Sequence, residues 1–523
     1  MVESDYPDVP LPEEPYHEII LKAIKQHIDN GKNKIAFING EKPSDMVTFK
    51  QVYDNAYSIA AFLHTKGFAK DVACAVIPNL WHYSAFFLGV ALRGGAVSGA
   101  SSMFTEYELQ RQFVDSRAKV VLTSEHSLEK VLKAIQGGTE VQLVIYIPES
   151  TEGHVPHGVV SWNDIVKTSP STSIPRAIID VDRDMILLPY SSGTTGNPKG
   201  VMLSHRNFAT MITLYMRHET TNITPFLDAN WDYEMEKIIL FLPFYHVYGF
   251  GQFLLFRISF LIKRLIHFLP VVPPIMVFLA KHPICEQYDL SSLKMLICGA
   301  APAGKDICEE LSKKYPNIKY IRQGYGMTEC TMASHLPDLK NEVPFGSVGK
   351  VASNLRMKIV DPSTGKEMPA GMSGEICIKG PTVMLGYLGN VDATKATIIN
   401  GWLHTGMIQK SHLDLVTIVR RSSVLYIAIL NVAPAELEDL LLTHPLIRDA
   451  AVIGVPDKRA GELPKAFVVR TSENLTEEDV KLWVKEKSLT LQAIEGRCGI
   501  YRRDSKIASR KDFTESVTRP CCF

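Results

Sequence analysis

The sequence predicts an α/β fold in which open parallel sheets carry helices on both faces, followed by a small α+β domain. Over the first 185 residues, short apolar runs alternate with stretches of helical apolar spacing, a pattern typical of parallel sheets. The apolar pattern starts afresh from Ala433, after a boundary near residue 420. Because 523 residues are too many for one hydrophobic core, we expect two domains, 1–420 and 421–523.

The expected elements follow the chain in order. Helical spacing predicts helices at Tyr16–His27, Val52–His64, Trp81–Leu92 and Leu128–Ile135. Apolar runs predict strands at Ala73–Ile77, Lys119–Thr123, Val141–Ile147, Ile186–Leu188, Ile238–Leu242, Met295–Cys298, Ile318–Gln323 and Glu375–Lys379. In the second domain a helix is expected at Pro434–Leu442 and a strand at Ala450–Val455.

The overall composition is that of an ordinary globular protein. Lys+Arg and Asp+Glu balance at 56 each, so no net charge favours binding to nucleic acid or an anionic membrane. The nine cysteines lack metal-ligand or disulfide spacing, and the first residues do not form a signal peptide. We expect a reducing compartment, most simply the cytoplasm. The last residues, 520–523, match no Ser-Lys-Leu address, and a peroxisomal location stays open.

One strongly apolar zone runs from Phe250 to Ala280. Arg257, His267 and several prolines interrupt it, so no apolar helix there reaches the roughly 18–20 residues that a membrane span needs. The zone is interpreted as buried core, with membrane contact as the alternative.

A loop rich in glycine and hydroxyl groups follows the strand at Ile186–Leu188. Glycines permit tight turns that point backbone N–H groups at one centre, and hydroxyls and a lysine add further donors. The loop contains Ser191, Ser192, Gly193, Thr194, Thr195, Gly196 and Lys199. This set favours a polyphosphate ligand, although the spacing is not that of a Walker A loop. The alternative is an ordinary surface turn.

Two further segments follow predicted strands. In Gly299-Ala300-Ala301-Pro302 the small side chains allow a flat ring to lie against the backbone, although small residues there can simply make a tight turn. The second segment runs from Gln323 through Gly324 and Tyr325 to Thr328 and Glu329. It offers an aromatic face for stacking, a hydroxyl donor for a phosphate and a carboxylate for Mg²⁺. The alternative is a strand-end turn with an isolated acid.

These segments resemble the adenylate-forming superfamily of acyl-CoA synthetases, 4-coumarate–CoA ligases and luciferases, most closely the ligases similar to 4-coumarate–CoA ligase. The resemblance covers about Val9 to Arg470. It implies a large N-terminal domain with a β-barrel-like part and a mobile C-terminal domain. It also implies that the loop holds the phosphates of ATP, and that 299–301 and 323–325 hold adenine.

The resemblance implies roles for three further residues. His246, which alone would pass for a core histidine among aromatics, matches the residue that orients the attacking carboxylate. Arg420 matches an arginine that reaches the ATP ribose. Lys511 matches the lysine that drives adenylation, although Arg510 replaces the family's preceding glycine and a plain basic tail is the alternative.

The sequence departs from the family pattern in blocks. Met407 replaces an aspartate that hydrogen-bonds the ribose hydroxyls, Val419 replaces the hinge aspartate, and Ala428-Ile429 replace a Lys-Gly pair that contacts CoA. The pattern resumes at Val432, and such clean edges suggest displaced exon boundaries or a decayed gene as a hypothesis.

The leading hypothesis is an ATP-dependent acid–CoA ligase that uses Mg²⁺. It would form an acyl-adenylate and then a thioester from a fatty or aromatic acid and CoA. The alternatives are a catalytically impaired descendant that binds nucleotide or acyl ligand, and an adenylate-forming protein similar to luciferases.

Overall fold

The computed structural model describes most of the chain. The described residues are 1–31, 33–149, 155–167, 174–191, 198–231, 238–255, 266–344, 346–412, 415–418, 425–427, 430–432, 434–457, 461–472, 474–487 and 498–501. The chain divides into two compact units: one comprises residues 1–191 and 199–421, and the other residues 192–198 and 422–523. The exact division at residue 420 stays a prediction. Each unit is described by itself.

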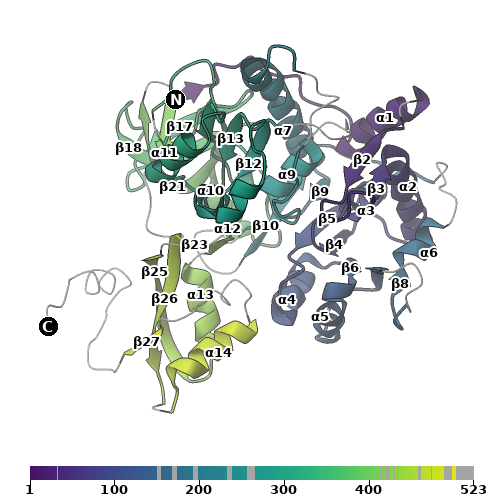
Figure 1. Cartoon of the computed structure of the whole chain (residues 1–523). Helices are drawn as coiled ribbons and strands as arrows, with labels where there is room; N and C mark the ends of the chain where they lie inside the picture. The colour runs from purple at the N-terminus through teal and green to yellow at the C-terminus, as the bar shows by residue number, and fades with distance from the viewer. Residues whose placement is uncertain are drawn as a thin grey trace. The chain divides into compact units, whose positions relative to one another are not determined.

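The largest sheet has nine described strands and a parallel centre (Figure 1). Its parallel strands are β4 (Val72–Val76), β5 (Ala96–Ala100), β6 (Val120–Ser124), β7 (Leu143–Ile147), β8 (Val160–Ser161) and β9 (Met185–Leu187). Every residue of β4 is buried. Ala73 and Ala75 belong to one apolar cluster, whereas Cys74 and Val76 belong to another. Both faces of the sheet are therefore covered, as the sequence predicts.

Helices cover the two faces of this sheet. One face packs against α1 (Tyr16–Asp29), α2 (Phe49–Thr65) and α3 (His82–Leu92), and the other against α4 (Glu106–Ser116) and α5 (Glu125–Gln136). Thr48 and Thr105 begin α2 and α4 as N-caps, each with a reciprocal capping box. These boxes satisfy backbone donors that the first turn of a helix leaves unpaired.

An antiparallel edge completes the nine strands. β11 (Lys199–Ser204) pairs with β9, with β10 (Tyr190–Ser191) and with β19 (Gly386–Tyr387). The sequence did not predict this edge, because β10 and β19 are only two residues long and one contains glycine. The edge brings residue 387 to the start of the glycine-rich loop.

A second parallel sheet contains three described strands, β12 (Phe268–Val271), β13 (Met295–Cys298) and β14 (Tyr320–Gln323). Pro270 lies in β12, at the edge of this sheet, where a missing N–H is tolerated. Pro273 and Pro274 occupy the first turn of α10 (Pro273–Lys281). These prolines thus begin a helix, whereas the sequence suggested that they only break one.

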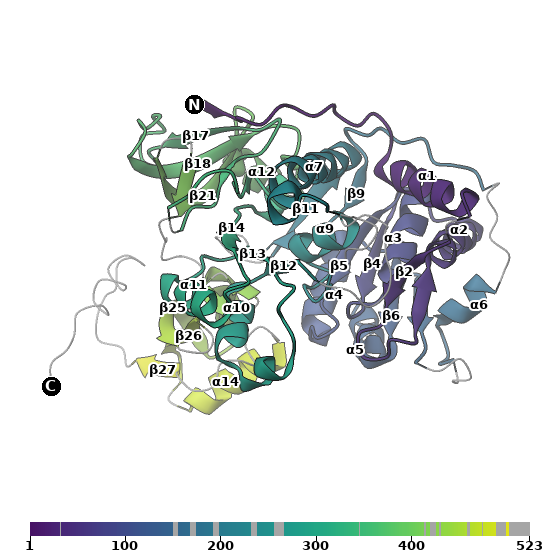
Figure 2. The same cartoon turned by 45° about the horizontal axis from the view of Figure 1, so that its top comes forward.

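A third, antiparallel sheet corresponds to the expected barrel-like part (Figure 2). It contains β1 (Val2–Glu3), β17 (Arg356–Val360), β18 (Ser373–Lys379), β20 (Ile398–Ile399), β21 (Trp402–His412) and β22 (Leu415–Ile418). The remaining elements of this unit are β2 (Ile35–Ile38), β3 (Met46–Thr48), α6 (Trp162–Val166), α7 (His205–His218), η1 (Glu219–Ile223), α8 (Thr224–Leu227), α9 (Val247–Leu255), η2 (Pro283–Gln287), α11 (Lys305–Lys314), η3 (Thr328–Cys330), β15 (His335–Leu336), β16 (Lys350–Val351) and α12 (Val391–Thr397).

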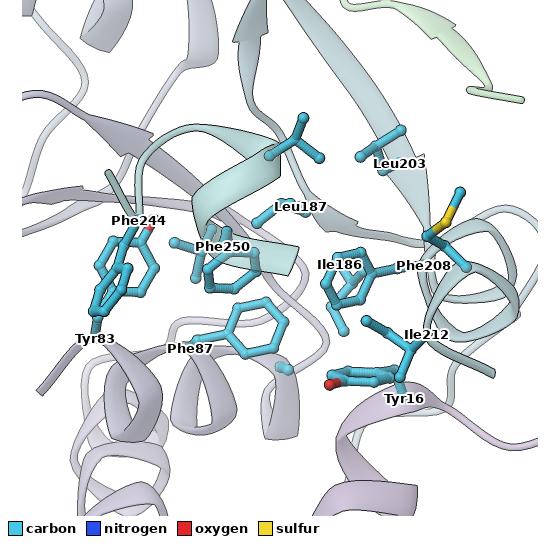
Figure 3. Close-up of a cluster of buried hydrophobic side chains, with 14 of the residues drawn as sticks. Tyr16, Tyr83, Phe87, Ile186, Leu187, Leu203, Phe208, Ile212, Phe244 and Phe250 are labelled. Atoms are coloured by element: carbon cyan, nitrogen blue, oxygen red, sulfur yellow. The ribbon is translucent and has the colours of Figure 1, made fainter. Parts of the chain in front are cut away.

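Aromatic side chains fill the core between the large sheet and its helices (Figure 3). Phe250 is 1% exposed and contacts the rings of Tyr83, Phe87 and Phe208. The ring centroids of Phe87 and Phe250 lie 4.9 Å apart in an edge-on arrangement, which aromatic pairs favour. The start of the apolar zone at Phe250 is therefore core, as expected. No described helix is long and apolar enough to cross a membrane.

The second unit is α+β, as predicted. It contains β23 (Leu425–Ile427), β24 (Leu430–Val432), α13 (Pro434–Leu442), β25 (Ile447–Asp457), β26 (Gly461–Arg470), α14 (Glu477–Lys487) and β27 (Cys498–Tyr501). Leu437 and Leu441 of α13 pack with Val452 and Val468 of the sheet. α13 has the predicted bounds, and β25 extends three residues before and two after its predicted range, Ala450–Val455.

The prediction of a strand at Ile238–Leu242 is wrong, and these residues have no regular secondary structure. The side-chain amide of Asn79 donates to the carbonyls of Leu240 and Leu242 at 3.0 and 2.8 Å. A side chain therefore satisfies backbone groups that a neighbouring strand would otherwise pair. The other predicted strands of the first unit are confirmed, with bounds shifted by up to two residues.

Six histidines with largely buried rings in this unit predict that the protein loses stability in acid. Burial lowers the pKa to about 3 in His17, His82 and His335, and to about 4 in His205, His218 and His246. Below pH 6.5 these histidines become protonated in the unfolded chain. In the folded chain they stay neutral until the pH approaches their lowered pKa values. The free energy of unfolding should therefore fall as the pH drops from about 6.5 towards 4.

Denaturant titrations at several pH values check this. Among the residues that the structure describes, neither ring nitrogen of the fully buried His205 has a hydrogen-bond partner, so His205→Phe should fold. Between pH 6 and 5, the free energy of unfolding of this variant should fall by about 1.4 kcal/mol less than that of the wild type. His126→Gln, at an exposed position, is the control and should follow the wild type. Parallel slopes in the wild type and His205→Phe would contradict the prediction.

Candidate active site

The glycine-rich loop begins and ends at one place. Ser191 of β10 and Lys199 of β11 are directly paired in an antiparallel ladder, so the two ends of the loop lie beside each other. Gly200 lies in β11 under the ring of Tyr190, where an added Cβ would approach within 3.2 Å. Ser192, Gly193, Thr194, Thr195 and Gly196, which the sequence assigns to phosphate binding, lie outside the described residues.

The carboxyl group of Glu329 lies beside this hairpin. Its Oε1 accepts hydrogen bonds from the Ser191 hydroxyl at 2.7 Å and from the Tyr387 hydroxyl at 2.9 Å. Glu329 is only 2% exposed, and the ammonium group of Lys199 lies 5.3 Å from the ring centroid of Tyr387. The structure thus brings together three candidate residues, 191, 199 and 329, from distant parts of the sequence.

Tyr387 is a member of this group that the sequence did not reveal. Burial, together with the charge and hydrogen bond of Glu329, raises the pKa of the Tyr387 phenol well above its usual value. The phenol therefore stays protonated and can only donate to Glu329. A lone Tyr in a Gly-Tyr-Leu-Gly turn carries no sequence signal; only the pairing of β19 with β11 places it here.

The two candidate adenine segments lie side by side. Cys298 and Gln323 end the parallel strands β13 and β14 at the same register, so 299–301 and 323–325 leave the same edge of the sheet. The N–H of Gly324 donates to the carbonyl of Cys298 at 3.1 Å, and the Gln323 side chain accepts from the N–H of Ala303 at 2.9 Å. This is the carboxyl edge of a parallel sheet, where ligands of α/β proteins bind.

Each adenine segment has one unusual feature. Ala300 has φ +66°, a left-handed conformation that costs a non-glycine residue roughly 1–2 kcal/mol. Tyr325 is 8% exposed and lies in an antiparallel bridge to His335, with the ring centroids 5.6 Å apart. Little of its ring is therefore open for stacking in this conformation.

His246 lies at the start of α9, where a turn, not a strand, precedes it. Its Nδ1 accepts the N–H of Tyr248 at 3.2 Å, which places the ring proton on Nε2. Burial lowers its pKa to about 4, so the ring is neutral at pH 7. The Tyr248 ring lies over Gly299, where an added Cβ would be 3.0 Å from its Cε1. The histidine turn therefore borders segment 299–301.

The remaining candidates are placed less completely. Thr328 is buried at the start of η3, next to Glu329. Met407 lies within β21. Arg420 and Lys511 lie outside the described residues.

This fold and site define a class of α/β enzymes that bind a nucleotide at the edge of a parallel sheet and carry a small α+β domain. The AMP-binding enzyme family matches residues 24–388, and the AMP-binding enzyme C-terminal domain matches residues 436–507. The chain belongs to the AMP-binding enzyme family.

Relatives and solved structures agree with this assignment. The chain is 33% identical to 4-coumarate–CoA ligase 1 of Arabidopsis thaliana, over 99% of this chain and 92% of that protein. It is 35% identical to 4-coumarate–CoA ligase 2 of Petroselinum crispum, over 92% and 90%. The fold is similar to that of amide bond synthetase McbA from Marinactinospora thermotolerans, with TM-score 0.77, 19% identity and coverage of 94% and 96%. A long-chain-fatty-acid–CoA ligase from Archaeoglobus fulgidus gives TM-score 0.71, 22% identity and coverage of 96% and 100%.

The turn before Glu329 depends on a glycine. A Cβ at Gly326 would lie 1.8 Å from the carbonyl oxygen of Met332, whereas at Gly324 the nearest atom would be 3.3 Å away. Gly326→Ala should therefore lower the free energy of unfolding by about 3 kcal/mol, the upper end for overpacking. The matched variant Gly324→Ala should change it by less than about 1 kcal/mol. Urea titrations followed by fluorescence measure both, and equal values would contradict the assigned backbone path.

Proposed function

We propose that this chain is an ATP-dependent acid–CoA ligase. The observation that carries the proposal is the joining of Ser191, Lys199 and Glu329, of which Glu329 lies six residues after the end of β14. In the first step an oxygen of the acid attacks the α-phosphorus of ATP, and pyrophosphate leaves to give an acyl-adenylate. In the second step the CoA thiol attacks the acyl carbon and loses its proton, and AMP leaves.

The loop between β10 and β11 supplies donors for the phosphates. Ser191, Ser192, Gly193, Thr194, Thr195 and Gly196 would surround the β- and γ-phosphates, and Lys199 would neutralise part of their charge. Glu329 would hold Mg²⁺, which prefers carboxylate oxygens, and Thr328 would donate to the α-phosphate. Gly299, Ala300, Ala301, Gln323, Gly324 and Tyr325 would hold adenine.

His246 would align the acid. With Nδ1 engaged by the N–H of Tyr248, the Nε2–H is the donor for a carboxylate or acyl-adenylate oxygen. A neutral imidazole can orient the attacking carboxylate through this one hydrogen bond. Because the ring carries no positive charge, the carboxylate keeps the negative charge with which it attacks the phosphorus.

Two residues outside the described part of the chain would also take part in the reaction. Arg420 would reach the ribose, and Lys511 would neutralise charge that develops at the α-phosphate. Rotation of the small domain about residues 419–420 would then exchange Lys511 for a CoA-binding face.

The acid is proposed to be aromatic, because the relatives at 33–35% identity are named for 4-coumarate. A fatty acid is the second candidate.

Pyrophosphate release tests the proposal. With ATP, Mg²⁺ and a panel of aromatic and fatty acids, we expect release that depends on the acid, followed by thioester formation when CoA is added. Glu329→Gln keeps a carbonyl oxygen for the Ser191 and Tyr387 hydroxyls but loses the charge that holds Mg²⁺, so its rate should fall by about 100-fold or more. Folded protein that releases no pyrophosphate at millimolar ATP would instead be a non-catalytic descendant.

Met407 provides a gain-of-function prediction. The family's ribose-binding aspartate stands at this position, and charge-assisted hydrogen bonds contribute roughly 1.5–3 kcal/mol each. Met407→Asp should therefore lower the KM for ATP by about 100-fold, with a smaller effect on the KM for the acid. Met407→Leu, which supplies no acceptor, is the control. Equal ATP dependence in the two variants would remove the ribose contact from the proposal.

A further inference from the structure

Three side chains with metal-ligating atoms converge on the antiparallel sheet. Cys377 of β18 and His404 of β21 are directly paired across the two strands. Glu375 lies two residues before Cys377, so its side chain leaves the same face of the sheet. The ligand atoms of Glu375, Cys377 and His404 all lie within 4.8 Å of one another.

The distances suit a tetrahedral ion. Zinc binds nitrogen and oxygen at roughly 2.0–2.2 Å and sulfur at about 2.3 Å, which places neighbouring ligand atoms about 3.3–3.7 Å apart. The Cys377 sulfur lies 3.4 Å from Nδ1 of His404, within this range. The Glu375 Oε2 lies 2.9 Å from the same Nδ1, so the carboxylate needs to withdraw by only about 0.4 Å.

Without an ion, Nδ1 of His404 faces both the Glu375 carboxylate and the Cys377 thiol. Nδ1 of His404 either donates its proton to Glu375 or accepts one from the Cys377 thiol, and it cannot do both. One of the two neighbours of the ring is therefore poorly satisfied in the metal-free protein. A cation bound by all three atoms removes this conflict.

The group of three side chains is partly exposed to solvent. The Glu375 and His404 side chains are 13% and 21% exposed, whereas Cys377 is buried. The ion would therefore keep a position open for water on the exposed side. Sulfur and imidazole ligands select zinc over Mg²⁺, which separates this site from one for the magnesium of ATP.

We propose that Glu375, Cys377 and His404 form a zinc-binding site. The second carboxylate oxygen, Oε1 of Glu375, accepts the N–H of Gly406 at 2.7 Å. The ion would thus tie β18 to the part of β21 that precedes Met407. This site does not depend on the proposed ligase activity.

Cobalt substitution tests the site in the full chain. After chelator treatment, Co²⁺ should bind with about one equivalent and produce a thiolate-to-cobalt charge-transfer band. Cys377→Ser should abolish that band, because the sulfur is lost. Cys285→Ser replaces another buried cysteine and should leave the band unchanged. No band in the wild type, or the same band in Cys377→Ser, would overturn the proposal.

A second measurement keeps the test open if Cys377→Ser does not fold. Zn²⁺ in excess should raise the Tm of the wild type and of Cys285→Ser, because binding to the folded state stabilises it. The rise should vanish in His404→Gln, and Mg²⁺ should produce no comparable rise. A zinc-dependent shift that survives in His404→Gln assigns the metal to other residues and refutes the site.

Discussion

The buried carboxyl group of Glu329 is the constraint that organises the candidate site. A carboxyl group that is 2% exposed must be hydrogen-bonded, because an unpaired buried group costs several kcal/mol. Its partners, Ser191 and Tyr387, lie 138 and 58 residues away in sequence. The requirement therefore fixes three segments at once: the end of β10, the start of η3 and the short strand β19. The strands β10 and β11, which bound the glycine-rich loop, are therefore held beside Glu329.

The second constraint is the shared register of β13 and β14. Because Cys298 and Gln323 end their strands side by side, two segments without regular structure emerge together and bond to each other. The left-handed Ala300 and the close approach of Tyr248 to Gly299 show how tightly that edge is built. The same turn that carries Tyr248 fixes the tautomer of His246. The hydrogen bond from the Tyr248 N–H to Nδ1 of His246 thus orients the imidazole at the start of α9 and leaves its Nε2–H as the donor.

The sequence predicted the elements that local patterns encode and missed those made by pairing. Apolar runs located β4, β6, β7 and β13, because a strand buried on both faces needs such a run. The same rule failed at Ile238–Leu242, where the amide of Asn79 binds the carbonyls instead. Glycine and hydroxyl content predicts a phosphate loop, and that stays a prediction. Tyr387 and the Glu375–Cys377–His404 group depend on strand register, which composition does not carry.

Strand pairing around Met407 bears on how its substitution should be interpreted. Pairing between β18 and β21 joins Cys377 to His404 on one side of this position and Glu375 to Ile408 on the other. Pairing with β22 then continues from Gln409. The register of β18 and β21 shifts between these two pairs, because residues 405–407 of β21 stand opposite the single residue 376 of β18. Met407 therefore lies in an irregularity of the ladder, although β21 continues through it. Because pairing resumes at Ile408 and continues with β22, the structure favours a local change at this position over loss of the surrounding sheet.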